Sequence, residues 1–456
     1  MSADYAGSWR ALIAGALLAL VAWFSYQSNL LGVVNERTFG FGSSISERLV
    51  IDGMAEHDRG NTSAVPMGRY ATGSTNVGSG SGEYRPYLSQ YGLQGELFGA
   101  LHRGLGLTVE DMRALNSALL ALVVGAFCVV LARDFGLRAA LAFSVPLAVS
   151  PLLVIYAHDL YWVSWTWLLP ALLAFAFGAS VYKGSGALTL FLLAFGAAML
   201  LKLLCGYEYL TTVALAATAP VAYHGLRSGR PFSAVLGRLV LMGLATVVAF
   251  AIAVGFHATR FGSLSGGPAH IRALAQKRLY RTDPVAASKE ACADDFWQDA
   301  QCESVYIESL NAGTGAVLAK YLAPKYMLPW FSRWESFDPM VELKAAIESS
   351  VKARSPQPLM ELVRKEGVQA VLPYVPRVLS ALFLAILVVG TAIRILRAGD
   401  RRVPLAAMVL LALLAPLSWF VAAKGHSYVH VELNSALWYV IFIPTALAVL
   451  SEPKRV

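Results

Sequence analysis

Charged side chains are scarce in this sequence: Asp, Glu, Lys and Arg make up 14% of its 456 residues, and 57% of the residues are hydrophobic. An ordinary soluble domain carries about 25% charged residues, so this composition excludes that class. Several apolar runs exceed the roughly 18 residues that suggest a helix across a membrane. Their Leu, Ala, Val, Phe and Gly suit helices better than barrel strands. The composition predicts an all-α, multi-span membrane protein.

Short motifs of several enzyme classes are also missing. There is no glycine-rich phosphate loop and no dinucleotide-binding glycine motif, which argues against ATP or NAD as a cofactor. No repeat of fixed period is present, and the four cysteines form no C-x-x-C pair that would favour zinc. Cys128 lies within an apolar run, as a small core residue would. Cys292 and Cys302, in "CADDFWQDAQC", form either a local disulfide or two free thiols.

The net charge of +8 would favour nucleic acid as a partner of a soluble protein. In a membrane protein, however, Lys and Arg accumulate in cytoplasmic loops and set the orientation. We therefore predict a lipid membrane as the partner and no nucleic acid. The stretch "YAGSWRALIAGALLALVAWFSYQSN" lacks a small-residue cleavage site, so we interpret it as an uncleaved first span.

The apolar runs predict about ten membrane-spanning helices. They cover approximately residues 9–29, 113–132, 138–157, 160–181, 185–204, 208–226, 234–256, 378–396, 403–422 and 433–450. If the first span runs outward, every short inside connection is basic, as the positive-inside rule requires. These connections hold Arg133, Arg138, Lys183, Arg227, Arg230, Arg238, Arg394, Arg397, Arg401 and Arg402. Both termini are then cytoplasmic.

This topology divides the chain into a first span (1–29), a first outer loop (30–112), a transmembrane core (113–256), a second long outer loop (257–377) and a C-terminal transmembrane part (378–456). The first outer loop contains a flexible Gly/Ser stretch, "ATGSTNVGSGSG". In the flanking pieces "SISERLVIDGMAEHDR" and "PYLSQYGLQGELFGALHRGLG", apolar residues recur at helical intervals. We predict two short amphipathic helices on the outer membrane surface.

Ionisable residues gather in four separated segments that this topology places on the outer face. The candidates are Asp52, Glu56, Asp58, Arg59 and Arg85 in the first loop, His158 and Asp159 in "YAHDLYW", Lys202 and Glu208 around "KLLCGYEYL", and His426 and His430 in "AKGHSYVHVELN". Charged groups near membrane depth are costly and therefore mark functional sites. The convergence predicts one shared outer-face site.

Each piece also has a structural alternative. Asp159 would serve equally as the cap of the following helix, and Lys202 as a lysine that reaches the membrane interface. His426 and His430 share a helical face and could bind a metal ion, but no third ligand is evident. The aromatic run "YWVSWTW" is typical of an interfacial belt.

Acids, cations and aromatics beside a helical bundle suit transfer of a sugar from a lipid phosphate. Cations would hold the leaving phosphate and a carboxylate would deprotonate the acceptor hydroxyl. A single displacement needs only one base, whereas glycoside hydrolysis uses two carboxyl groups. No nucleotide is then needed outside the cell.

On these features the chain resembles the GT-C superfamily of integral-membrane glycosyltransferases. The resemblance implies a GT-C-like helical bundle in a bacterial inner membrane, a periplasmic site, a polyprenyl-phosphate sugar donor and a glycan or protein acceptor. "VIDGMAEHDRG" matches the acidic first-loop site, which makes Asp52 the expected base, followed by Asp58 and Glu56. The remaining candidates would bind substrate. No metal ligand is assigned, and a divalent metal stays open as a cofactor.

The sequence departs from parts of this family. No large soluble domain follows the last span, the "WWDYG" motif of oligosaccharyltransferases is absent, and Asp52-Gly53 stands where an Asp-Glu pair is common. Two alternatives remain. A polysaccharide polymerase or O-antigen ligase would use Arg272, Lys277, Arg278 and Arg281 of the late outer loop. A transporter or lipid flippase would show repeats and mid-membrane polar groups, which are not apparent.

Overall fold

The computed structural model describes residues 2–36, 39, 46–61, 66–72, 81–261, 312–324, 327–330, 355, 357, 375–430 and 434–452. The fold is mostly helical (79%). Six helices in this part of the chain are long and apolar enough to cross a membrane: α1 (Ser2–Ser28), α5 (Val109–Phe135), α9 (Ser185–Cys205), α11 (Phe232–Phe261), α18 (Val375–Leu396) and α19 (Arg402–Ala422). The chain is therefore a multi-pass membrane protein.

A seventh candidate span is broken. Helices α6 (Leu137–Ala148) and α7 (Pro151–Ala157) meet at an angle of 64°. The break has a local cause: Ser150 caps α7 through the amide of Leu153, and Pro151 follows at the first helical position. The described residues thus give six candidate spans, or seven if the bent pair counts as one.

Three of the predicted spans coincide with helices that are shorter or more polar. Residues 160–181 contain α8 (Trp165–Phe177), with Pro170 inside it, and 433–450 contain α21 (Ser435–Val440) and α22 (Phe442–Ser451), which break at Ile441. Residues 208–226 correspond to α10 (Leu210–Arg227), whose apolar character is diluted by polar side chains. These are Thr211, Thr212, Thr218, His224 and Arg227. Helices form in all three of these ranges, as predicted. Helix breaks and polar side chains leave each apolar stretch too short or too polar for a candidate span.

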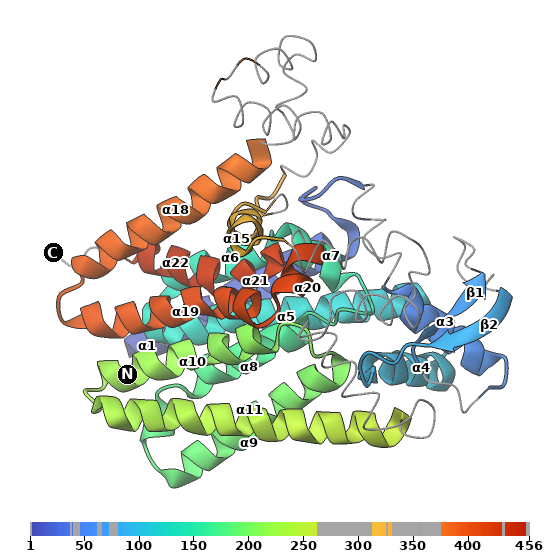
Figure 1. Ribbon diagram of the computed structural model, residues 1–456. Helices are drawn as coiled ribbons and strands as arrows, with labels where there is room; N and C mark the ends of the chain where they lie inside the picture. The colour runs from blue at the N-terminus through green and yellow to red at the C-terminus, as the bar shows by residue number, and fades with distance from the viewer. Residues whose placement is uncertain are drawn as a thin grey trace.

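Among the long helices, α1 packs antiparallel against α5, and α9 packs against α11 (Figure 1). The backbones of α1 and α5 approach closely at Gly15 and Gly125, where a Cβ on either glycine would collide with the facing helix. At the other end of the same contact, the Trp23 indole donates to the carbonyl of Ala114 at 3.2 Å. Small residues allow such close approach in membrane bundles, where dispersion replaces the hydrophobic driving force.

The described part of the segment between α1 and α5 contains α3 (Arg48–Asp58), β1 (Gly68–Thr72), β2 (Ser81–Pro86) and α4 (Leu93–Leu105), which gather at one end of the bundle (Figure 1). Helices form in both segments where the apolar spacing predicted them. The antiparallel hairpin of β1 and β2 was not predicted; its register places Tyr70 opposite Tyr84 and Arg69 opposite Arg85. The hairpin packs on α3, which positions the α3 carboxylates.

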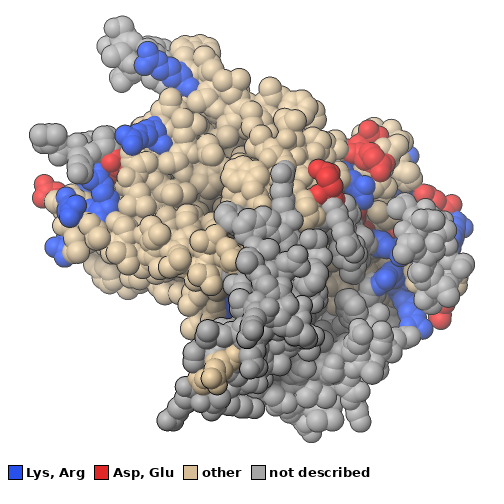
Figure 2. All heavy atoms as spheres, turned by 90° about the horizontal axis from the view of Figure 1, so that it is seen from above, with Lys and Arg blue, Asp and Glu red and all other residues tan. Residues whose placement is uncertain are grey.

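Basic residues cluster at the opposite end, where α5, α10 and α18 end. Arg133 pairs with Asp134, Arg230 donates to the carbonyl of Tyr182, and Arg401 pairs with Glu452. In Figure 2 most of the visible charged residues lie toward the two ends, and the part of the surface between them that is not grey is mainly uncharged. An uncharged band between charged ends is what a lipid bilayer requires.

Candidate functional site

Asp52 lies on the buried face of α3 and is 3% exposed. One carboxylate oxygen, Oδ2, is 3.7 Å from Nη2 of Arg48, one helical turn earlier. The main-chain amide of Tyr70 donates to the same carboxylate, so α3 and β1 meet there. Burial raises the pKa of Asp52 above its ordinary value, and the charge of Arg48 offsets this only in part.

Glu56 lies one turn further along α3, toward its exposed end. It accepts hydrogen bonds from the Asn61 amide at 2.9 Å and from the Tyr70 hydroxyl at 2.8 Å. The bond from Asn61 is the main reason that the pKa of Glu56 is lowered. The Arg59 guanidinium lies over the Tyr70 ring, 4.4 Å from its centroid. Glu56 and Arg59 thus converge on Tyr70.

Asp58 and Arg85 lie apart from Asp52. Asp58 is exposed and pairs with His102 of α4 at 3.2 Å, so it ties the two surface helices together. Arg85 is exposed on β2. Its cross-strand neighbour Arg69 is half-buried instead, and its charge acts on Asp52. Burial, and then the charge of Arg48, lowers the pKa of Arg69 to about 10.

Arg48 and Arg69 are not among the candidate residues predicted from the sequence. The spacing of four residues between Arg48 and Asp52 could have predicted their contact, because such residues share one face of a helix. The position of Arg69 could not be predicted, because only the register of the hairpin brings it to α3.

Asp159 is fully buried at the end of α7, in the turn that leads to α8. Its Oδ1 accepts from the main-chain amide of Tyr161 at 2.7 Å, which closes the turn locally. The residue that precedes α8 is Ser164, so Asp159 holds its own turn rather than capping that helix. The Asn116 amide of α5 donates to the carbonyls of Ala157 at 3.1 Å and of Asp159 at 3.0 Å. The turn is therefore fixed to the bundle.

His158 is held as a neutral ring. Burial lowers its pKa to about 4, and the nearby charge of Arg113 adds to the effect. The ring stacks on Phe39 with centroids 5.0 Å apart. A neutral, stacked imidazole does not supply a cation for a phosphate at pH 7.

Glu47, which the sequence analysis did not single out, links the first loop to this turn. Its buried carboxylate accepts from Nε of Arg113 at 2.9 Å, from Nη2 of the same side chain, and from the amide of Leu160 at 3.2 Å. Burial raises the pKa of Glu47 and of Asp159, and the charge of Glu47 raises that of Asp159 further. One Glu–Arg pair therefore joins the starts of α3 and α5 to the 158–162 turn.

Lys202 and Glu208 line a small pocket next to that turn. Its walls are Tyr161, Trp162, Trp167, Lys202, Cys205, Gly206 and Glu208, around about 230 Å³ of unfilled space that includes its open mouth. Lys202 is 2% exposed, and its ammonium group donates to the carbonyls of Gly206 and Glu208, so it closes the end of α9. A Cβ at Gly206 would lie 2.6 Å from the Glu208 carboxylate and 2.8 Å from the Gln90 amide oxygen. Glycine lets those two polar groups converge.

His426 and His430 reach the pocket walls through aromatic contacts. Their ring centroids are 4.7 Å apart, and His426 lies 6.0 Å from Tyr209. Tyr209 in turn packs against Trp162 at 6.2 Å and Trp167 at 5.1 Å. Trp167 is buried in this cluster and does not form an interfacial belt.

Metal binding finds no support in the part of the chain that the structure describes: no three His, Cys, Asp or Glu side chains are grouped to hold an ion. Cys128 and Cys205 are buried free thiols. The predicted disulfide partners Cys292 and Cys302 lie outside the described residues, as do Arg272, Lys277, Arg278 and Arg281.

Comparison with known proteins assigns no family, because no family model, no curated protein and no solved structure matches the chain. The fold establishes a helical, multi-pass membrane protein with six to seven candidate spans. Its function has to be argued from the site.

Proposed function

We propose that the chain is a GT-C-like glycosyltransferase of about ten spans, which moves a sugar from polyprenyl phosphate to an acceptor hydroxyl at the outer face of a bacterial inner membrane. One observation carries this proposal. The four polar segments separated in sequence meet at the same end of the bundle, through Glu47, the 158–162 turn and the aromatic contacts of Tyr209. A site assembled from several elements is typical of an enzyme. Charged side chains that only reach toward the membrane surface would not need to meet in this way.

Asp52 is the proposed general base. Arg48 and Arg69 lie around this single carboxylate, so the local charge is positive and favours an anion such as the donor phosphate. In the reaction, the acceptor oxygen bonds to the anomeric carbon and passes its proton to the Asp52 carboxylate. The bond from that carbon to the phosphate oxygen breaks, and polyprenyl phosphate leaves with the electron pair. A raised pKa suits this role, because the base must accept a proton near the working pH.

The aromatic side chains around this pocket are proposed to contact the sugar at the pocket's rim, because the enclosed space itself holds only about one water molecule. Ring faces provide apolar contact, while Glu208 and Gln90 offer acceptors and donors to hydroxyl groups. The backbone beside this pocket is strained: Val163 has φ 36° and Tyr209 has φ 64°. Positive φ at non-glycine residues costs free energy. It tends to occur at functional sites, where the surrounding structure holds the strained backbone in place.

The basic end supports the orientation. The short connections that hold Arg133, Arg227 and Arg397 lie at the end opposite α3, which the positive-inside rule assigns to the cytoplasm. The candidate site then faces outward, where nucleotide sugars are absent and a lipid-linked donor is required.

The test is transfer by the purified full-length chain in detergent, from radiolabelled polyprenyl-phosphate pentoses and hexoses to lipid-linked glycan and exported-protein acceptors. Asp52→Asn is expected to lose about 100-fold to 10,000-fold of the rate, as for removal of a general base. Asp58→Asn, which alters the surface pair with His102, is the matched control and should stay active. Size-exclusion profile and unfolding temperature check that both variants fold.

Several outcomes would contradict the proposal. Full activity of Asp52→Asn would remove the assignment of the base. Turnover only with pyrophosphate-linked glycans would favour the polymerase or ligase alternative. Movement of lipid between leaflets without any covalent product would favour a transporter. A chelator that leaves turnover unchanged would exclude a labile catalytic metal ion.

A further inference from the structure

A buried histidine lies near the C-terminal end of α11, a helix of mainly apolar residues. His257 is 1% exposed and belongs to the face that α11 buries against the bundle. That face is formed by Val235, Met242, Ala249, Ala253, His257 and Phe261. The other five side chains are apolar, so an imidazole at this position needs hydrogen-bond partners from other elements. The proposed transfer step does not use this ring.

Both ring nitrogens of His257 have partners in other segments. Nε2 lies 3.0 Å from the carbonyl oxygen of Leu88, and Nδ1 lies 3.0 Å from the Tyr207 hydroxyl. A carbonyl oxygen can only accept, so Nε2 carries the proton and donates to Leu88. In the neutral ring Nδ1 then accepts from Tyr207, whose ring is stacked on the imidazole with centroids 5.7 Å apart. One side chain therefore joins α11 to two segments that are distant in the sequence.

The two partners belong to segments that supply polar groups to the rim of the aromatic pocket. Leu88 lies in the connection between β2 and α4, two residues before Gln90. Tyr207 lies in the turn between α9 and α10, next to Glu208. Gln90 and Glu208 approach each other, because a Cβ at Gly206 would lie within 2.8 Å of both side chains. The separation of these two groups therefore depends on how the two segments are held together.

Other contacts keep the connection between β2 and α4 in place when His257 is replaced. The main-chain amide of Gly92 donates to the last turn of α9 at 3.1 Å. Arg260, on the next turn of α11, pairs with Glu96 of α4 at 2.6 Å and lies 4.7 Å from the centroid of the Tyr91 ring. The C-terminal end of α11 lies beside α4 (Figure 1). These contacts hold the end of the connection near α4, and His257 holds the end near β2.

We propose that His257 is a positioning residue for the candidate site. Its two hydrogen bonds fix the separation of Gln90 and Glu208 by holding their segments together. This role rests on the proposed function, in which both groups contact the sugar. Asp52 is held separately, by its contacts with Arg48 and with β1. Loss of His257 should therefore weaken binding of the sugar donor and leave the proton-transfer step nearly unchanged.

Replacements of His257 separate its two hydrogen bonds. In His257→Gln, the amide nitrogen can lie near the position of Nε2 and keep the bond to Leu88. In His257→Asn, the amide oxygen can lie near the position of Nδ1 and keep the bond from Tyr207. His257→Leu removes both bonds at a similar side-chain volume. Tyr207→Phe removes the second bond from the opposite side, so it should match His257→Gln.

The first measurement does not depend on turnover. Hydrogen exchange of the main-chain amides in residues 87–92 and 206–209 is followed by mass spectrometry of the purified full-length chain in detergent. Each lost bond should raise the exchange of its own segment about fivefold, since a buried hydrogen bond contributes about 1 kcal/mol. His257→Leu should affect both segments, His257→Asn only 87–92, and His257→Gln and Tyr207→Phe only 206–209. Exchange that stays unchanged in these folded variants would overturn the proposal.

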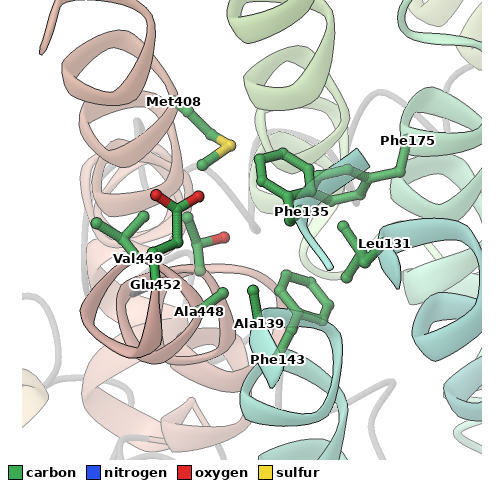
Figure 3. Close-up of a pocket in the computed structure, with 10 residues that line it drawn as sticks. Leu131, Phe135, Ala139, Phe143, Phe175, Met408, Ala448, Val449 and Glu452 are labelled. Atoms are coloured by element: carbon green, nitrogen blue, oxygen red, sulfur yellow. The ribbon is translucent and has the colours of Figure 1, made fainter. Parts of the chain in front are cut away.

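His224 provides the matched control, because it is 5% exposed and lies at the basic end, 3.6 Å from the Asp134 carboxylate. Its ring centroid is 6.5 Å from that of Phe135, which Figure 3 shows among apolar side chains of the bundle. His224→Leu also removes a buried imidazole, but it should leave exchange in residues 87–92 and 206–209 unchanged. An equal rise in this control would show a general loss of stability and overturn the positioning role.

The second measurement is the transfer reaction. His257→Leu should raise KM for the polyprenyl-phosphate sugar about tenfold and change kcat less than about twofold, whereas Asp52→Asn lowers kcat. If His257→Leu fails to fold, Tyr207→Phe gives the same test with a rise in KM of about fivefold. Raised exchange with an unchanged KM would overturn the role in sugar binding. Absence of transfer by the unmodified chain would remove the proposed function, while the exchange result would still decide whether His257 holds the two segments.

Discussion

Asp52 is buried and has two neighbouring cations. Burial and the two cations shift its pKa in opposite directions. Burial raises the pKa of the carboxyl group, while the charges of Arg48 and Arg69 lower it. The net shift is upward. A base with a raised pKa is a stronger proton acceptor than an exposed aspartate, and the two arginines favour its ionised form. In the proposed mechanism, the arginines would therefore adjust the pKa of the base as well as attract the donor phosphate.

Arg48→Gln should move the acid limb of the pH–rate profile to higher pH. The proposed base works deprotonated, so activity should fall as pH falls through the pKa of Asp52. Loss of the Arg48 charge should raise that pKa further. The measurement is kcat/KM against pH for the transfer reaction. Arg103→Gln, an exposed arginine of α4, should leave the limb in place. An unmoved limb in Arg48→Gln would show that Asp52 does not control the profile.

At the scale of elements, the position of α3 depends on one buried pair. Glu47 and Arg113 connect α3 to α5, and Glu47 also holds the turn that carries Asp159. Two carboxyl groups with raised pKa values lie beside this single guanidinium. Removal of the cation would leave them without compensation in a buried site.

Arg113→Gln is expected to destabilise the protein by about 3–5 kcal/mol, the cost of breaking one partner of a buried pair. The loss should grow with pH: both carboxyl groups have raised pKa values, so the folded state favours their protonated forms and loses stability as rising pH ionises them. Thermal unfolding in detergent at pH 5 and pH 8 measures this. Arg133→Gln, which breaks an exposed pair with Asp134, should cost at most about 1 kcal/mol. Equal effects of the two substitutions would contradict the stabilising role of the Glu47–Arg113 pair.

The contact between α3 and the hairpin depends on a glycine. A Cβ at Gly53 would overlap the main-chain oxygen of Pro66, just before β1. Gly53→Ala should therefore displace the hairpin, lower stability by about 1–3 kcal/mol as overpacking does, and reduce transfer because Arg69 and Tyr70 move away from α3. Gly104→Ala in α4 meets no atom within 4 Å and should be neutral or stabilising. The unfolding temperature and the transfer activity of the two variants measure these effects.

For the whole molecule, the sequence predicts structure that depends on neighbouring residues, but it does not predict contacts between residues that are distant in the chain. The apolar runs predicted the long helices, and helical spacing predicted α3 and α4, since both depend on near neighbours in the chain. The break at Pro151 shortened one expected span, and the hairpin was missed because strand pairing is set by partners distant in sequence. Glu47 and Arg113, 66 residues apart, were missed for the same reason. The predicted topology placed the four polar segments at one end of the bundle, but it did not predict which side chains contact one another there.

The orientation predicts opposite accessibility of the two ends. In a variant with the native cysteines replaced, Lys183→Cys at the basic end should react with a membrane-impermeant maleimide only after the cells are opened, while Glu83→Cys on β2 should react in intact spheroplasts. Both positions are exposed, so a difference in labelling reports the side of the membrane and not burial. The physical reason is the bias of Lys and Arg toward the cytoplasm, which fixes short basic connections inside. Labelling of both positions from the same side would contradict the bundle topology. Exchange of the two results would place the candidate site in the cytoplasm, where a nucleotide sugar, rather than a lipid-linked one, would be the natural donor.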